Sequence, residues 1–124
     1  AAHADGQVAG LRLFVGQVRV DLLLSVTGLE AEACACAEVL ELVPGIHVPV
    51  VTLPYLLLFK LVAVVNRRRL QDEADIETML AYAQPAERQQ VPAMIGRLAG
   101  AYRTDVEAAH KHWLRLSGDP STGV

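Results

Sequence analysis

The spacing of apolar residues changes near the middle of this sequence, and that change limits what the chain can fold into. In much of the first 51 residues, apolar and polar residues alternate in short runs, as in β-strands with one buried face. From Thr52 onward, apolar residues recur every three or four positions, which is typical of amphipathic helices. Strands first and helices last predict an α+β fold.

The first strand pair is predicted at residues 10–25. Gly16-Gln17 suits a two-residue turn with glycine first, and this turn places Arg12 opposite Asp21. The aliphatic residues then share one face, which we expect to lie on the core, and the charged residues share the other. The remaining elements are predicted in this order: a short helix at about 29–37, strands at 39–43 and 46–51, helices at about 53–65 and 70–83, and a long amphipathic helix from 91 to about 116.

The length and composition indicate one compact domain over residues 1–124, which we divide into a part at 10–83 that holds the strands and first helices and a C-terminal amphipathic helix region at 85–117. Hydrophobic residues make up 52% of the chain, which excludes general disorder, and the net charge of −3 argues against binding to duplex DNA. The two cysteines, Cys34 and Cys36, are too close in sequence for a comfortable disulfide, and we interpret them as small buried residues.

The most apolar stretch, residues 48–65, does not predict a membrane span. Pro49, Pro54 and Lys60 interrupt it, and a span needs about 20 apolar residues without a central charge. A buried core element is therefore expected. The N-terminal residues show no secretory signal pattern, so a cytoplasmic location is expected.

Asp21 is a candidate functional residue because it lies on the polar face of a predicted strand. Its ordinary role there is a cross-strand ion pair with Arg12. Its functional alternative is a metal ligand, since a carboxylate on a rigid strand suits Mg²⁺.

Lys60 is a second candidate, because its neighbours one helical turn away are all apolar. A lysine in such surroundings extends to water, finds a carboxylate, or opens onto a cleft. Arg67 returns to the same side of the helix seven residues later, and two cations on one side could bind a phosphate chain. The run Arg67-Arg68-Arg69 is followed by Asp72 and Asp75, which predicts a self-neutralising, solvated helix surface.

Four segments together resemble the small polymerase-β-like nucleotidyltransferases, a group that includes toxins of bacterial toxin–antitoxin pairs. The segments are VRVDLL at 18–23, IHVPVVTL at 46–53, LFKLVA at 58–63 and NRRRLQDEADI at 66–76. Members of that group have a strand with VDLL, a GV-x-VPV hairpin, a lysine-bearing helix and an arginine before D-x-x-D-I. The resemblance covers about residues 11–80, in the family's order.

The resemblance implies a nucleotidyltransferase-like mixed or antiparallel sheet with the C-terminal helices packed on it. It also implies Mg²⁺ as cofactor and a nucleoside triphosphate as substrate. The implied site residues are Asp21 as catalytic metal carboxylate, Lys60, Arg67 and Arg68 as nucleotide-binding residues, and Asp72 and Asp75 as cleft or structural residues.

The sequence departs from the family at its beginning. The family places an Asp-x-Asp strand before VDLL, whereas only about ten residues precede the hairpin here, and Ala4-Asp5-Gly6 does not replace that strand. We therefore expect either the C-terminal part of a longer nucleotidyltransferase or a degenerate relative. In both cases we expect weak nucleotide binding and no transfer, since two-metal phosphoryl transfer needs several carboxylates.

Two functions follow from these expectations. The first is nucleotidyl transfer to an unknown acceptor by the complete parent protein. The alternative is a non-catalytic interaction domain, which would pair with a protein partner or a second copy through a sheet edge or the C-terminal helix.

Overall fold

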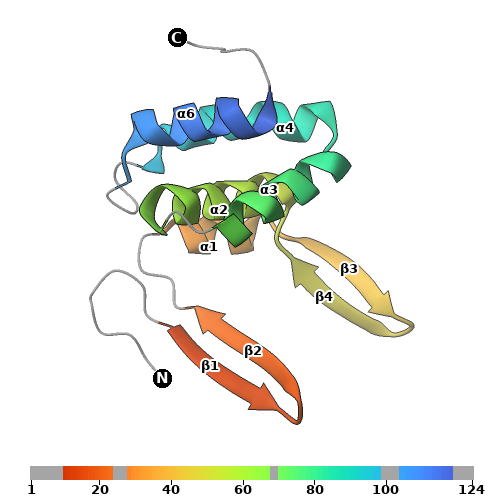
Figure 1. The fold of residues 1–124 in the computed structure, drawn as a ribbon. Coiled ribbons are helices and arrows are strands. Elements are labelled where there is room, and N and C mark those ends of the chain that lie inside the picture. The colour runs from red at the N-terminus through yellow and green to blue at the C-terminus, as the bar shows by residue number, and fades with distance from the viewer. Residues whose placement is uncertain (1–9, 24–27, 68–69, 99–103, 119–124) are drawn as a thin grey trace.

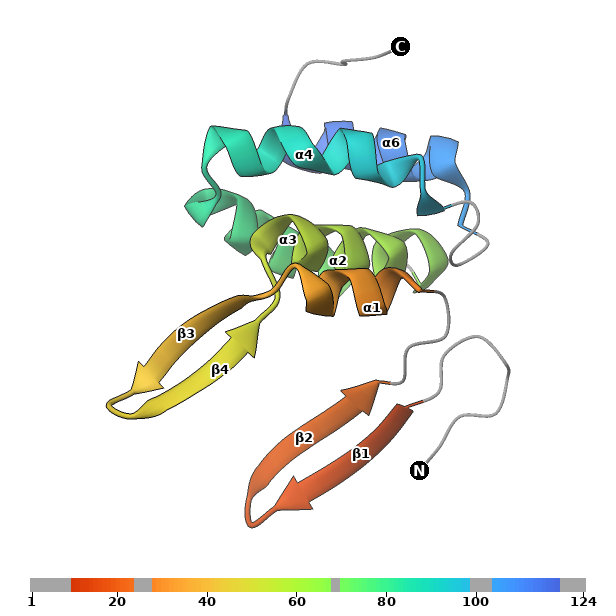
Figure 2. The ribbon, with the colours of Figure 1, turned by 180° about the vertical axis from the view of Figure 1, so that it is seen from behind.

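The computed structural model describes residues 10–23, 28–67, 70–98 and 104–118, and it has an α+β fold. Helices stack on one another in a single body, and two β-hairpins extend from one side of it (Figure 1). The same arrangement is visible from behind (Figure 2).

The helical body is organised around α2, Leu53–Arg67, which packs against α3 (Leu70–Tyr82), α4 (Pro85–Ile95) and α6 (Val106–Ser117). The predicted helices at 53–65 and 70–83 are thereby confirmed to within two residues. The most deeply buried large apolar side chains are those of Trp113, Leu57, Leu58, Leu61, Ile76, Ile95, Leu98, Val64 and Val91. The hydrophobic core therefore lies between the helices.

The expected long C-terminal helix is wrong: among the described residues of this region, α4 ends at Ile95 and a separate helix, α6, begins at Val106. Helix α4 ends with Gly96 as its C-cap residue, and α6 begins after Asp105, whose Oδ1 accepts a hydrogen bond from the Ala108 amide at 3.1 Å. Such an N-cap satisfies an amide that would otherwise lack a partner at the helix start. The three- and four-residue apolar spacing continues through the break because both helices bury residues in the same core.

The first hairpin consists of β1 (Gly10–Val15) and β2 (Val18–Leu23), paired antiparallel in the predicted register, with Arg12 opposite Asp21. Gly16 has a φ of 61°, as the predicted glycine-first turn requires. The short helix α1 (Leu29–Ala35) follows and buries Leu29 and Ala33 in the helical core. The second hairpin joins β3 (Glu38–Val43) to β4 (Ile46–Val50), also as predicted, with an irregularity in register between Glu41 and Val43.

The expected single sheet with helices packed on it is wrong for the described residues. They form two separate two-stranded sheets, and the buried core contains no hairpin side chain among those whose burial is described. The physical reason is that the helices bury their apolar faces against one another, which leaves none for the strands. The aliphatic face of β1 and β2, expected on the core, is largely exposed.

Two further findings concern the apolar segments. No helix within the described ranges is long and apolar enough to cross a membrane. Cys34 and Cys36 are both free and exposed, so their interpretation as buried residues is wrong. They lie at the end of the short α1, whose buried positions are Leu29 and Ala33.

Candidate functional site

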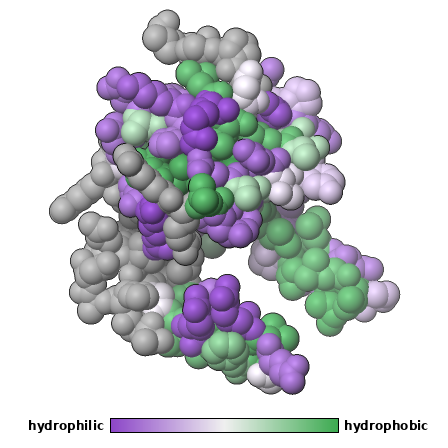
Figure 3. Space-filling model, in the orientation of Figure 1, coloured by the Kyte–Doolittle hydropathy of each residue, from purple (hydrophilic) through white to green (hydrophobic). Residues whose placement is uncertain are grey.

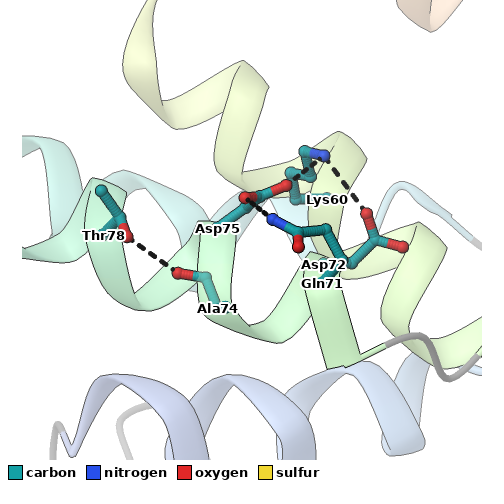
Figure 4. Close-up of polar contacts among 6 residues, drawn as sticks. All are labelled: Lys60, Gln71, Asp72, Ala74, Asp75 and Thr78. Carbon is teal, nitrogen blue, oxygen red and sulfur yellow. Dashed lines mark hydrogen bonds and ion pairs between the residues drawn. The ribbon is translucent and has the colours of Figure 1, made fainter.

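Lys60 connects α2 to α3 through two carboxylates. Its Nζ lies 3.2 Å from Asp72 Oδ1 and 2.7 Å from Asp75 Oδ2. Figure 4 shows the lysine reaching from one helix between the two aspartates of the other. Asp72 and Asp75 are three residues apart on α3, so they lie on the same side of that helix. Gln71 Nε2 also donates to Asp75 Oδ1 at 2.8 Å.

The three charged groups differ in their access to solvent. The Asp72 side chain is 2% exposed, whereas those of Lys60 and Asp75 are 33% and 30% exposed. The hydrogen bond to Asp75, followed by that to Asp72, raises the pKa of Lys60 against the opposing effect of burial. Lys60 is therefore protonated at neutral pH and compensates a buried carboxylate.

This arrangement selects one of the three alternatives for Lys60: the amine finds carboxylates. It also corrects the expectation of a solvated surface at Asp72, which is among the most deeply buried side chains. A lysine whose charge is matched by two aspartates attracts an anionic phosphate less than an unpaired lysine does. Arg67, in the last turn of α2, is exposed, and Arg68 lies outside the described residues.

Asp21 forms a separate cluster on the first hairpin. Its Oδ1 accepts a hydrogen bond from Arg12 Nε at 2.9 Å, and its Oδ2 lies 3.6 Å from Arg19 Nε. The Asp21 side chain is 42% exposed, and the hydrogen bond from Arg12 lowers the pKa of its carboxyl group. The cross-strand ion pair predicted from the register is thus present.

The surroundings of Asp21 do not fit a Mg²⁺ site. Two guanidinium groups already neutralise its carboxylate, whereas Mg²⁺ favours oxygen ligands in octahedral order. Within the described ranges, no three His, Cys, Asp or Glu side chains are grouped so that they could hold a metal ion. Strand β2 pairs only with β1 there, so the strand of Asp21 is not a central strand of a larger sheet.

A third polar cluster was not predicted from the sequence. Tyr55 in α2 donates a hydrogen bond to Glu32 in α1 at 2.8 Å, and Arg97, after α4, donates to the other Glu32 oxygen. Burial, followed by the hydrogen bond to Glu32, raises the pKa of Tyr55 to about 12. Glu32 and Arg97 are 65 residues apart, and no local pattern in the sequence indicates their contact.

The exposed apolar residues are concentrated on the hairpins. Among the described residues, the large exposed hydrophobic side chains other than Leu70 and Tyr82 all belong to the two hairpins, where they are 39–68% exposed. In Figure 3 the second hairpin, at the lower right, is mostly green. The first hairpin, at the bottom centre, turns hydrophilic atoms toward the viewer, with apolar atoms beside them.

We define the aliphatic face of the first hairpin by Leu11, Leu13, Val15, Val18, Val20 and Leu22. In the observed register, Leu11 faces Leu22, Leu13 faces Val20 and Val15 faces Val18, so the six side chains lie on one side of the strand pair. All are exposed except Val20, which is half-buried. The opposite side carries Arg12, Phe14, Arg19 and Asp21.

Comparisons with known proteins do not assign this site: no protein-family model matches the chain, and no curated protein is detectably similar to it in sequence.

Proposed function

We propose that this chain is a protein-interaction domain whose binding surface is the aliphatic face of the first hairpin. The observation that carries the proposal is the division of apolar residues between the two parts of the fold. The helices bury theirs in a shared core, whereas the hairpin exposes a contiguous aliphatic face.

An exposed apolar face of this kind is unfavourable for a protein that acts alone. Each buried Val or Leu side chain contributes about 1.5–3 kcal/mol relative to its exposed form, so covering the face is favourable. Contiguous apolar patches rimmed by charged groups mark interaction sites on soluble proteins. Here the charged residues Arg12, Arg19 and Asp21 lie on the reverse side of the same strands, so the aliphatic face itself carries no charge.

Nucleotidyl transfer remains a second candidate, for the complete parent protein. Its support is the order of elements along the chain, which is the order that the resemblance implies. Two hairpins are followed by a helix that carries Lys60 and then by a helix that carries Asp72 and Asp75. Lys60 is paired with two aspartates, and Asp21 is paired with two arginines. Because both candidate residues already have partners of opposite charge, an interaction domain is favoured over a nucleotide site within this chain. Mg²⁺, nucleotide and any antitoxin partner therefore stay predictions of the resemblance.

Site-specific photo-crosslinking tests the interaction proposal. A photoreactive amino acid at position 13, on the aliphatic face, is expected to crosslink to a discrete protein in cells that express the chain. The matched control places it at position 70, where Leu70 is also apolar and exposed but lies on α3, away from the hairpins. Equal crosslinking from both positions, or none from position 13, would contradict the proposal.

A further inference from the structure

The outer edge of β2 has no strand beside it among the described residues, because the sheet consists of β1 and β2 alone. Val18, Arg19, Asp21 and Leu22 on this strand are all exposed. An exposed strand edge presents unpaired backbone N–H and C=O groups that can pair with another chain. The side chains at such an edge determine which strand fits best and in which register.

The β2 sequence is complementary to itself when a second copy runs antiparallel about Val20. In that register Arg19 faces Asp21 of the second copy, and Asp21 faces Arg19 of the second copy. Val18 likewise faces Leu22 of the second copy, so aliphatic residues meet aliphatic residues. Opposite charges directly across two strands stabilise the pair, and like charges destabilise it.

Neighbouring registers lose this match. Centring the pair on Arg19 or on Asp21 places like charges opposite each other. A one-residue slip places charged residues opposite aliphatic ones, because side chains alternate between the two faces of a strand. Of these registers, only the one about Val20 places aliphatic residues opposite aliphatic residues on one face and two pairs of opposite charge on the other.

The other exposed strands are less suited to self-pairing. Strand β1 has Arg12 as its only charged residue, so it offers no opposite-charge pair with its own copy. Strand β3 carries only acidic charges, Glu38 and Glu41. Strand β4 contains Pro49, which has no backbone N–H to donate.

We propose that two copies of this chain associate through their β2 edges, antiparallel about Val20, to form a four-stranded sheet of order β1–β2–β2–β1. The inference rests on the proposed function in one respect: pairing extends the aliphatic face from two strands to four, and the partner protein would bind this wider face. On the reverse side, Arg19 of each copy, which lies 3.6 Å from Asp21 of its own strand, also comes opposite Asp21 of the other copy, so the two aspartates are shared among the arginines of both copies.

A charge-exchange experiment tests the register. Arg19→Asp leaves acidic residues at positions 19 and 21. In a dimer of this variant, position 19 of each copy faces position 21 of the other, so two acidic residues face each other at both places. Arg12→Asp with Asp21→Arg keeps an ion pair within the hairpin but leaves arginines at 19 and 21, which oppose each other between copies. The Kd of each dimer is expected to rise about tenfold or more relative to wild type. Sedimentation velocity and native mass spectrometry measure this.

Mixing the two variants supplies the decisive result. In the mixed dimer, acids at 19 and 21 face arginines at 21 and 19, so the heterodimer is expected to form with an affinity near that of wild type. Lys111→Asp on α6 is the control, because it makes the same change in charge as Arg19→Asp at an exposed site away from the hairpin. It is expected to dimerise as wild type does.

Three outcomes would overturn the inference: a wild-type chain that stays monomeric, single variants that dimerise as wild type does, or a mixture that fails to form heterodimers. These results are separable from a failure of the proposed function. A monomeric chain that still crosslinks from position 13 to a partner refutes only the β2 pairing. A dimer whose aliphatic face crosslinks to no other protein refutes only the partner proposal.

Discussion

Lys60 Nζ lies 3.2 Å from Oδ1 of Asp72, and the aspartate side chain of this pair is buried while the lysine side chain is one-third exposed. The pair joins α2 to α3 at the core of the helical body. The apolar neighbours of Lys60 along α2 are therefore compatible with a charge at this position, because its amine pairs with a buried carboxylate. The cluster is therefore a structural feature of the helix pair.

Lys60→Met is expected to destabilise the fold, because it removes the ammonium group that pairs with the buried carboxylate of Asp72 and with Asp75. Removing one partner of a fully buried pair costs about 3–5 kcal/mol; because Lys60 and Asp75 are partly exposed and Asp72 has a further interaction, a smaller loss of about 1–3 kcal/mol is expected here. Urea unfolding measures the loss. Lys111→Met at the exposed Lys111–Glu107 pair is the matched control, with a change expected below about 1 kcal/mol.

The double variant Lys60→Met with Asp72→Leu distinguishes charge compensation from loss of packing. Replacing both members of a buried pair by apolar residues is often neutral or stabilising, so most of the lost stability is expected to return. A double variant that is as unstable as Lys60→Met alone would contradict charge compensation of Asp72 as the source of the lost stability.

Tyr55 is expected to ionise later than an ordinary tyrosine. Burial and its hydrogen bond to Glu32 raise its pKa to about 12 from the ordinary value of 10.0. Absorbance of the phenolate against pH should show one phenol that titrates near pH 12, and this step should be absent from Tyr55→Phe. Tyr82→Phe is the control, because Tyr82 is exposed. A high-pH step that survives in Tyr55→Phe would contradict the burial and hydrogen bonding of Tyr55.

The same shift predicts how stability depends on alkaline pH. Since folding raises the pKa of Tyr55, its contribution is fully present below pH 10 and is lost as pH rises toward 12. The pKa of Lys60 is also raised from its ordinary value of 10.5, so its contribution to stability is likewise lost as the pH rises above that value. The free energy of unfolding should therefore fall above pH 10, and the fall should be smaller in Tyr55→Phe. A fall as large in that variant would rule out a contribution from Tyr55.

The chain by itself is expected to bind nucleotides weakly and to transfer none. Asp21 is neutralised by Arg12 and Arg19, and Lys60 by two aspartates, so neither is available in the role that the resemblance implies. Incubation with each labelled nucleoside triphosphate, Mg²⁺ or Mn²⁺, and bulk RNA or protein should label nothing above background. Metal-dependent labelling that disappears in Asp21→Asn would contradict this and restore the catalytic assignment of Asp21.

Local features of the sequence predicted most of the elements. The turn at Gly16 and the strict alternation around it determined the register of the first hairpin, and the apolar spacing located α2 and α3. The same apolar spacing did not indicate the break before α6, because residues on both sides of the break are buried in one core. The start of α6 was marked only by Asp105, a residue type that favours helix N-caps.

The candidate site was predicted less well, for a different reason. The register indicated the Arg12–Asp21 pair, and a carboxylate partner for Lys60 was one of three open alternatives. Which carboxylate it would be depended on how α3 packs on α2, since Asp72 is 12 residues away in the chain. The exposure of the hairpin's aliphatic face could not be read from alternation, which shows that a face is apolar but not what covers it.

The most direct test of the central claim is the affinity of the purified partner captured from position 13. Isothermal titration calorimetry should give a Kd at least about tenfold higher for Leu13→Lys than for wild type, because a charge replaces an aliphatic side chain at the centre of the proposed surface. Leu70→Lys should bind as wild type does. Equal affinities for wild type and Leu13→Lys would show that the partner does not bind the aliphatic face, and the proposed function would be wrong.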